Sequence, residues 1–547
     1  MVRRAVPLGY LAVAMAVAVL VLPTALRPPP DPSNESGAIS PDAPPDNNPE
    51  QLIQSVQQAA GGGAGAAAGG ATTTTAAPLA PGVTQPVVTT TTIRRKAGLG
   101  SCFGTPKRQT ESIYAPPCQP AFVGDNGGET AHNVLANELH LSFNHALGAP
   151  PDGPVPEQPA SGEGSETRTM RVLQTFVNQR YETYGRKIRF YGTAAASDDT
   201  AALATSSTAD TQYKVFAAYN LAGAFCQDMA RRHLVVFCDP QSHDVYVRNR
   251  PGFFSWQMDF DQMFGFGAEY YCKRLKGKPA AHAGGLDLNA SRKVAIISEQ
   301  HADFGIPASR FQDAVVRECN GHMEDVVELA PGSADGAAAA IAKLRADGVT
   351  TVILNTTLAN TLYLMSAAGQ YQPEWVLLGN EGLDFNTVAE LLPANQSVHL
   401  FGVSGWELAR RPDDSECYRA YKSIDPDNDP NQTTCTVFWH PMNMMMAGIQ
   451  LAGPKLTPDA FQKALFSLGH RYEQTPWAIG GGYGPDDYSY MDSVGEIWFD
   501  AATQNPETGA PGAYRWTSNG KRYRRGQFDG DASGLFVSGV ASPPAGT

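Results

Sequence analysis

The chain has 547 residues, of which 42% are hydrophobic, so it is long enough for two to four packed domains. Its 54 Asp and Glu against 41 Lys and Arg give a net charge of −13, which argues against a protein that neutralises nucleic-acid phosphates. The 54 Gly and 41 Pro are too many for an even spread, so part of the chain is expected to differ from a globular domain.

The N-terminus predicts export. Arg3 and Arg4 precede an apolar run over residues 5–22, which Pro23 ends. A basic start before a long apolar run is typical of a signal peptide, and the run also approaches the shortest spanning helix. Residues 1–26 therefore fit both a cleaved signal peptide and an uncleaved signal anchor. Either one places the protein in the cell envelope, secreted or tethered to the outer face of the cytoplasmic membrane, with this segment as its sole membrane contact.

A linker follows at residues 27–98. Between Pro28 and Ile93 there is no Lys or Arg, and Pro-rich, Gly/Ala-rich and Thr-rich blocks succeed one another. Such a segment buries too little apolar surface to offset the entropy lost on ordering, so we expect it to be disordered.

Beyond Gly100, strand-like runs alternate with helical patterns. This alternation predicts parallel sheets covered by helices, an α/β architecture. The expected strands are Leu139–Phe143, Lys187–Tyr191, Lys214–Tyr219, Leu234–Cys238, Lys293–Ser298, Val326–Leu329, Thr350–Leu354, Trp375–Leu378 and Val398–Val403. The expected helices include Glu166–Thr183, Phe260–Lys276, Ala308–Cys319, Gly336–Asp347 and Asn360–Gly369.

Some 400 globular residues exceed what one core usually serves, so two lobes with a cleft between them are expected. The Gly-, Ala- and Pro-containing segment 276–291 is the expected crossing between them. The predicted division is a disulfide-stapled leading segment at 99–136, a first lobe at 137–284 with about 412–475, and a second lobe at 285–405 with about 485–530.

Eight cysteines in an exported chain favour disulfides over metal ligands. Cys226 follows one expected strand and Cys238 ends the next, which places both at one edge of a parallel sheet. Short loops favour neighbours for the others, and the last pair follows by elimination. The predicted pairs are Cys102–Cys118, Cys226–Cys238, Cys272–Cys319 and Cys417–Cys435.

Motifs of catalysis are missing from the sequence. No nucleophile elbow, P-loop or dinucleotide fingerprint follows a strand, and no His spacing suits zinc. His440 and the methionines at 442 and 444–446 lie in an almost uncharged helical stretch, where Met commonly fills core gaps. We therefore expect no catalytic residue, no metal site and no cofactor.

Three stretches carry a resemblance to a known family. They read KVAIISEQHADFG at 293–305, TVILNTT at 351–357, and AAGQYQP at 367–373 followed by WVLLGNEG at 375–382. This order of strand, polar loop and helix resembles the second lobe of type I periplasmic binding proteins, the class that binds branched-chain amino acids. The resemblance covers about 137–500 and implies two Rossmann-like lobes with parallel sheets, joined by a three-stranded hinge.

The resemblance also implies a ligand site at the carboxyl ends of the strands. In the first lobe the matching loop lacks the hydroxyl side chains of the family, so amino-acid specificity is in doubt. In the second lobe Glu381 matches the acid that meets a ligand ammonium group. The implied contacts are Asn220, Leu221, Ala222, Gly223, Asp239, Ser242, Phe304, Thr356, Thr357, Glu381 and Trp406.

The function expected from these features is capture of a small polar solute, an amino acid or an amine-bearing relative, for delivery to a membrane ABC transporter. Such a role needs no chemistry and no nucleic acid. A ligand-sensing or scaffold domain of the envelope, without a transport role, is the alternative. An exported hydrolase is the remote alternative, since no motif supports it.

Overall fold

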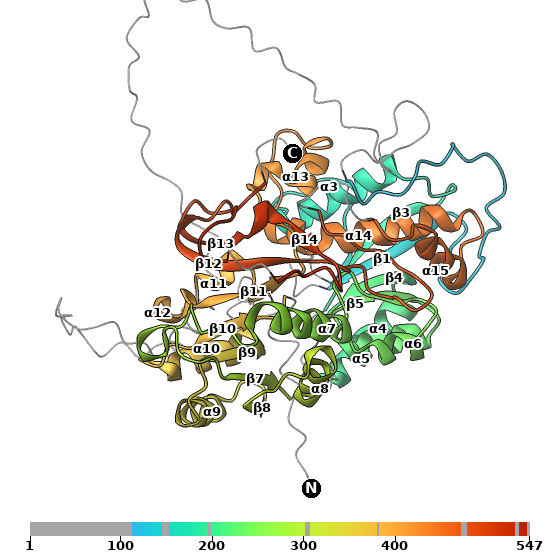
Figure 1. Ribbon diagram of the computed structural model, residues 1–547. Coiled ribbons are helices and arrows are strands. Elements are labelled where there is room, and N and C mark those ends of the chain that lie inside the picture. Colours follow the sequence, from blue (N-terminus) through green and yellow to red (C-terminus); the bar gives the residue numbers. More distant parts are fainter. Residues whose placement is uncertain are drawn as a thin grey trace, which may run out of the picture.

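The computed structural model describes residues 112–144, 152–194, 196, 198–300, 307–379, 382–471, 478–530 and 535–543. Two sheets, each flanked by helices, form the body of the molecule (Figure 1). The predicted signal segment and linker lie outside the described residues, as does the first part of the leading segment. No helix in the described part of the chain has the length and apolarity that a membrane crossing requires.

The first sheet has six strands in the order β2-β3-β1-β4-β5-β6. Its core strands pair in parallel, and β4 is buried along its whole length, as a strand covered on both faces must be. The strands are β1 (Glu138–Asn144), β2 (Gly153–Pro154), β3 (Lys187–Thr193), β4 (Val215–Asn220), β5 (Val235–Cys238) and β6 (Phe253–Phe254).

Helices cover both faces of this sheet (Figure 1). On one face α14 packs against α3, α13 and α15, and on the other α4 packs against α5. The helices are α3 (Ser165–Arg180), α4 (Asp199–Thr211), α5 (Gly223–Arg231), α6 (His243–Arg248), α13 (Glu416–Lys422), α14 (Gln432–Ala452) and α15 (Pro458–Ser467). The methionines of α14 at 442 and 444–446 are buried, which confirms their predicted place in the core.

The second sheet has eight strands, seven of them in the order β13-β12-β11-β10-β9-β7-β8, with β14 paired to β12. The pairs from β11 to β8 are parallel, whereas β12 adds to β11 as an antiparallel strand. The strands are β7 (Val294–Glu299), β8 (Asp325–Leu329), β9 (Thr351–Asn355), β10 (Glu374–Leu377), β11 (Leu400–Ser404), β12 (Val494–Gln504), β13 (Pro511–Trp516) and β14 (Arg522–Tyr523).

Helices α7 and α8 pack together on one face of the second sheet, and α9 and α10 on the other. Helix α7 continues into the single wide turn η2 (Tyr271–Leu275). The other helices are α7 (Phe260–Tyr270), α8 (Ala308–Cys319), α9 (Ala334–Ala346), α10 (Leu358–Ala368), α11 (Asn386–Ala389) and α12 (Ala394–Ser397). All nine predicted strands are confirmed with ends within two residues, and the five named helices are confirmed as well.

The chain passes between the two sheets three times. The first crossing, residues 255–259, joins β6 to α7, and the second, residues 405–415, joins β11 to α13. The third crossing, residues 484–493, leads from the loop after α15 into β12. Ser255 pairs with Ser489, so the first and third crossings lie side by side, and Arg522 Nη2 lies 2.6 Å from the carbonyl oxygens of both Gly405 and Ser493. Together the three crossings form the hinge.

The segment 276–291 differs from the expectation. Helix α7 already packs on α8 and β11 of the second sheet, so the chain has crossed before this segment begins. Within it, Gly284 N donates to Gln372 O at 2.8 Å, and Glu374 Oε1 accepts from His282 N at 3.0 Å. These hydrogen bonds hold the segment on the second lobe. Its Gly and Ala residues are small, so its backbone can approach that lobe closely.

Three of the predicted disulfides are confirmed. They join Cys226 to Cys238, Cys272 to Cys319, and Cys417 to Cys435. The first links α5 to the end of β5, as expected for two sites at one sheet edge. Cys102 lies outside the described residues, so its pairing with Cys118 stays a prediction.

Part of the leading segment is built into the hinge. Tyr114 is buried and meets Trp256 edge-on, with ring centroids 5.3 Å apart. Its hydroxyl donates to Glu407 Oε1 at 3.0 Å and accepts from Ile479 N at 3.0 Å. A single side chain therefore contacts the first and second crossings and the loop that leads into the third.

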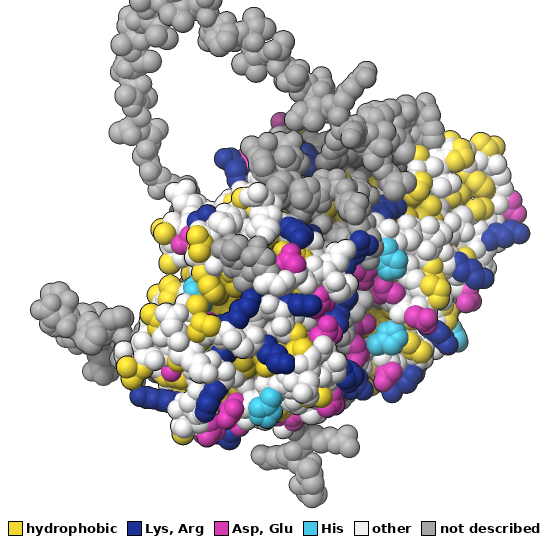
Figure 2. Space-filling model, viewed as in Figure 1, with side chains coloured by type: hydrophobic (Ala, Val, Ile, Leu, Met, Phe, Trp, Pro, Cys, Tyr) yellow, Lys and Arg dark blue, Asp and Glu magenta, His cyan; other side chains and the backbone are white. Residues whose placement is uncertain are grey.

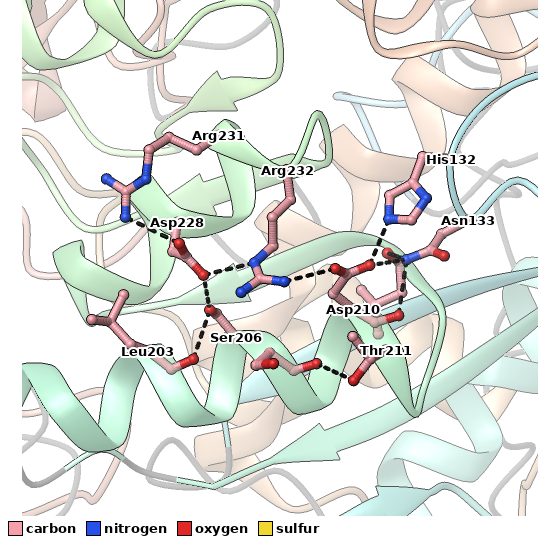
Figure 3. Close-up of polar contacts among 11 residues, drawn as sticks. His132, Asn133, Leu203, Ser206, Asp210, Thr211, Asp228, Arg231 and Arg232 are labelled. Carbon is pink, nitrogen blue, oxygen red and sulfur yellow. Dashed lines mark hydrogen bonds and ion pairs between the residues drawn. The ribbon is translucent and has the colours of Figure 1, made fainter.

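An ion-pair network fastens α4 to α5 (Figure 3). Arg232 donates from Nε to Asp228 at 2.7 Å and from Nη1 to Asp210 at 2.9 Å. His132, which precedes β1, lies 2.6 Å from the other oxygen of Asp210. Burial tends to raise the pKa of Asp210, but its hydrogen bonds, from Arg232 above all, outweigh this and hold the pKa below the ordinary value.

Candidate ligand-binding site

The first-lobe loop predicted to contact a ligand turns sharply after β4. Asn220 Oδ1 accepts from Asn144 Nδ2 at 3.1 Å and from Ala222 N at 2.9 Å. Both bonds draw the loop back over the strand ends, and the residues from Asn220 to Gly223 are buried. Helix α5 begins at Gly223 with no side-chain cap, because Ala222 stands at the capping position. The first turn of α5 is therefore the source of N–H groups in this loop.

The next loop carries Asp239 and Ser242. Burial raises the pKa of Asp239 to about 8. Gln257 Nε2 on the first crossing donates to Asp239 Oδ1 at 3.5 Å. Ser242 precedes α6 and holds Val245 N through its carbonyl rather than through its hydroxyl. Both predicted residues thus lie where the first sheet meets the hinge.

In the second lobe, both predicted threonines use their hydroxyl groups inside the protein. Thr357 caps α10 and donates from Oγ1 to Glu299 Oε2 at 2.7 Å, and Thr356 Oγ1 lies 2.9 Å from Thr361 Oγ1. Asn360 Nδ2 also donates to Glu299 Oε2, at 2.9 Å. Thr357 therefore positions the carboxylate of Glu299, whereas the hydroxyl of Thr356 pairs with Thr361 of α10.

Glu299 is a candidate site residue that was not among the predicted contacts. It ends β7, is 3% exposed, and its Oε1 has no hydrogen-bond partner among the described residues. Asn355 Oδ1, at the end of the neighbouring β9, is also buried without a partner in that part of the chain. An ionisable residue directly after a buried strand was the signal available in the sequence. The remaining predicted contacts of this lobe, Phe304 and Glu381, lie outside the described residues.

Trp406 stands on the second crossing, beside the loop after β10. Its ring packs on Phe385 with centroids 4.9 Å apart, and its buried Nε1 has no partner among the described residues. In the same loop Asp384 accepts from Ser404 Oγ at 2.5 Å, while burial raises its pKa to about 6. Asp384 Oδ1 is a further buried acceptor without a partner in the described part of the chain.

The other two crossings also carry aromatic side chains with unsatisfied polar atoms. Trp256 stacks on His440 of α14 at 4.3 Å and on Tyr490 of the third crossing at 4.5 Å. Trp256 Nε1 and Tyr490 Oη are buried and have no partner among the described residues. Each crossing thus contributes one aromatic residue whose N–H or O–H group has no partner within the described ranges, whereas the second-lobe strand ends contribute acceptors.

Comparisons with known proteins agree with this architecture. No protein-family model and no curated protein matches the chain. Among solved structures, a solute-binding protein of an ABC transporter from Rhodopseudomonas palustris BisB5, in complex with 3,4-dihydroxybenzoic acid, matches 71% of this chain and 98% of its own at 9% identity and a TM-score of 0.50.

Two further structures match equally well. A periplasmic binding protein from Burkholderia mallei matches 71% of this chain and 96% of its own at 11% identity and a TM-score of 0.50. Another R. palustris solute-binding protein, in complex with 4-hydroxybenzoate, matches 73% and 100% at 10% identity and the same score. At such low identity the likeness concerns the fold. With its two parallel-rich sheets and three crossings, the chain has the fold of the type I periplasmic binding proteins that serve ABC transporters.

Proposed function

We propose that the protein is an exported solute-binding protein that takes up a small polar ligand between its two lobes and presents it to an ABC transporter. The observation that carries this proposal is the hinge of three crossings, which joins two sheets with separate helical layers. Such a hinge permits rigid-body closure, and a ligand that binds the closed form better shifts the equilibrium toward it. The division into two lobes is part of this proposal, with the first lobe ending at the crossing over residues 255–259 rather than at the predicted residue 284.

The ligand that we favour carries hydrogen-bond donors, an amine above all, at its second-lobe end. Glu299 Oε1, Asn355 Oδ1 and Asp384 Oδ1 are buried acceptors without partners in the described part of the chain, and unpaired buried acceptors are costly. Glu381 would add a carboxylate at the same end. The polar N–H and O–H groups of Trp256, Trp406 and Tyr490 suit an acceptor group of the ligand near the hinge.

A binding screen tests this proposal. Full-length protein is heated with branched-chain amino acids, polyamines, choline-like amines and hydroxybenzoates. A true ligand at 100 times its dissociation constant adds about 2.7 kcal/mol to the free energy of unfolding. Calorimetry then compares wild type with Glu299→Gln and Glu381→Ala. Glu328→Gln, on an exposed part of β8, is the matched control for loss of a carboxylate.

We expect both site variants to weaken binding at least tenfold and the control to leave it unchanged. Binding by wild type that neither variant alters would remove the proposed amine contact. A panel without any ligand would favour the scaffold alternative, and genes for a permease and an ATPase beside this one would favour transport over sensing.

A further inference from the structure

A second cluster of polar side chains lies away from the strand-end loops, beside the third crossing. His470, Asp487 and Asp492 each offer one ligand atom, and these atoms lie within 4.8 Å of one another. His470 Nδ1 is 2.6 Å from Asp492 Oδ2, and Nε2 is 3.9 Å from Asp487 Oδ2. The face in Figure 2 shows histidine and acidic side chains next to one another in the region of α6 and α15.

The backbone fixes the three side chains relative to one another. Arg471 N donates to Gly481 O at 2.7 Å, and Asp492 N donates to Gly480 O at 3.0 Å, so three short segments pair. A Cβ on Gly481 would lie 1.5 Å from the carbonyl oxygen of Tyr490, so only glycine permits this approach. Reciprocal bonds between Gly484 and Asp487 hold the third residue in a tight turn. The cluster is therefore part of the fold rather than a chance meeting of long side chains.

Each carboxylate has one oxygen held from outside the cluster. Gln262 Nε2 of α7 donates to Asp492 Oδ1 at 3.1 Å, and Ser489 N donates to Asp487 Oδ1 at 3.3 Å. The Oδ2 atoms are the ones near His470. The same arrangement is common in metal sites. A neighbouring group forms a hydrogen bond with one oxygen of a carboxylate and orients it, and the other oxygen binds the ion.

The charges of the cluster also favour a cation. The carboxyl side chains of Asp487 and Asp492 are 19% and 11% exposed. The two carboxylates offer oxygens within 4.8 Å of each other and repel, and a divalent ion supplies two positive charges that remove this repulsion.

We propose that His470, Asp487 and Asp492 bind a divalent transition-metal ion, Zn²⁺ or Mn²⁺, completed by water. One imidazole nitrogen and two carboxylate oxygens suit these ions, whereas Ca²⁺ prefers oxygen ligands alone. Ligand atoms about 2.1 Å from a tetrahedral ion are about 3.4 Å apart, and the one atom that each of the three residues offers lies within 4.8 Å of the other two. The ion ties the loop after α15 to the third crossing and so braces the hinge, whatever solute the lobes bind.

The test uses full-length protein purified without a histidine tag, stripped with a chelator and titrated calorimetrically with Zn²⁺, Mn²⁺, Mg²⁺ and Ca²⁺. We expect one saturable site for Zn²⁺ or Mn²⁺, with a rise in the thermal midpoint. Asp487→Asn and His470→Ala should weaken the affinity at least tenfold. The matched control is His243→Ala, since His243 Nδ1 lies 3.6 Å from Asp259 Oδ2 in a His–carboxylate pair outside the cluster.

Circular dichroism verifies that the variants fold, and the wild-type titration does not depend on them. No saturable site in wild type would overturn the proposal and leave a simple ion pair of His470 with Asp492. Equal affinity in wild type and in both folded cluster variants would place the metal elsewhere. Tighter binding of Ca²⁺ or Mg²⁺ than of Zn²⁺ and Mn²⁺ would overturn the role of His470.

Discussion

At the scale of single residues, the structure separates the groups that hold the site together from those with unsatisfied polar atoms. Thr357 matched the family pattern, yet its hydroxyl is bound to Glu299. Glu299 has an oxygen without a partner among the described residues, and it was not predicted because the neighbours of a side chain at a strand end are known only in the folded protein. The predicted ligand contacts in these loops stay predictions, and the structure adds that the hydroxyl of Thr357 is engaged within the protein.

Asp239 gives a prediction of pH dependence. Its folded pKa of about 8 exceeds the ordinary value, so the folded state keeps a proton that the unfolded chain releases. Wild type should therefore lose stability as the pH rises from about 4 to about 8. The side chain retains some exposure, which limits the loss to about 1–2 kcal/mol.

Asp239→Asn should abolish this loss. The variant should be more stable than wild type at pH 9 and nearly equal to it at pH 4, as measured by urea unfolding across the range. Parallel stability curves for the two proteins would contradict the assignment.

At the scale of elements, the order and bounds of the strands followed from the sequence, because buried parallel strands read as continuous apolar runs. The antiparallel pair β12 and β13 was not among the predicted strands. Val494–Gln504 mixes charged and apolar residues, since its second half is exposed, and its pattern is therefore weaker.

The network between α4 and α5 should contribute to stability mainly through Arg232. Its guanidinium bridges Asp228 and Asp210, whereas Arg231 is 58% exposed and meets Asp228 alone. Arg232→Ala should lower the free energy of unfolding at pH 7 by about 1–2 kcal/mol, and Arg231→Ala, the control, by less than about 0.5.

The pH dependence of this loss follows from the lowered pKa values of Asp210 and Asp228. A carboxylate whose pKa is lowered in the folded protein stabilises the fold at pH values above its ordinary pKa. This stabilisation is lost as the pH falls. The difference between Arg232→Ala and wild type should therefore shrink toward pH 3 in chemical denaturation. Equal effects of both arginine variants at pH 7 would contradict the bridging role.

The disulfide between η2 and α8 is a second prediction at this scale. Cys272 and Cys319 are 47 residues apart, and closing such a loop in the unfolded chain is worth about 4 kcal/mol in the entropic model. Both residues are only partly buried, so Ala should leave little cavity. Cys272→Ala, Cys319→Ala and the double variant should all lose the same stability in guanidinium unfolding, because each breaks the same bond. Additive losses would show that the bond is not formed.

At the scale of the whole molecule, the two lobes are joined by three crossings and by a side chain that precedes them all. Tyr114 lies among Trp256, Glu407 and Tyr490, and so contacts each crossing. The leading segment, expected from its sequence to have little core of its own, is thus part of the hinge where the structure describes it.

Tyr114→Phe should destabilise the hinge. The change removes the hydroxyl that serves Glu407 and Ile479 N, and leaves both buried groups without that partner. We expect a loss of about 1–3 kcal/mol in unfolding and faster hydrogen exchange at the backbone of residues 255–259 and 484–493.

Tyr363→Phe is the matched control, since Tyr363 is partly buried and its hydroxyl makes no hydrogen bond within the described part of the chain. It should leave both readouts unchanged. Exchange that stays at the wild-type rate in Tyr114→Phe would contradict the contact between the leading segment and the hinge.

The sequence by itself determined the α/β class, nine strands, three disulfides and the likeness to two-lobed binding proteins. These depend on local apolar periodicity and on spacing along the chain, which the order of residues records directly. Tertiary structure alone decided the place of the first crossing, the contacts of Tyr114, the hydrogen bond between Thr357 and Glu299, and the proximity of His470 to Asp487 and Asp492. Each of these features depends on contacts between residues that are distant in sequence, or on which side-chain atoms find hydrogen-bond partners. A local sequence pattern contains neither kind of information.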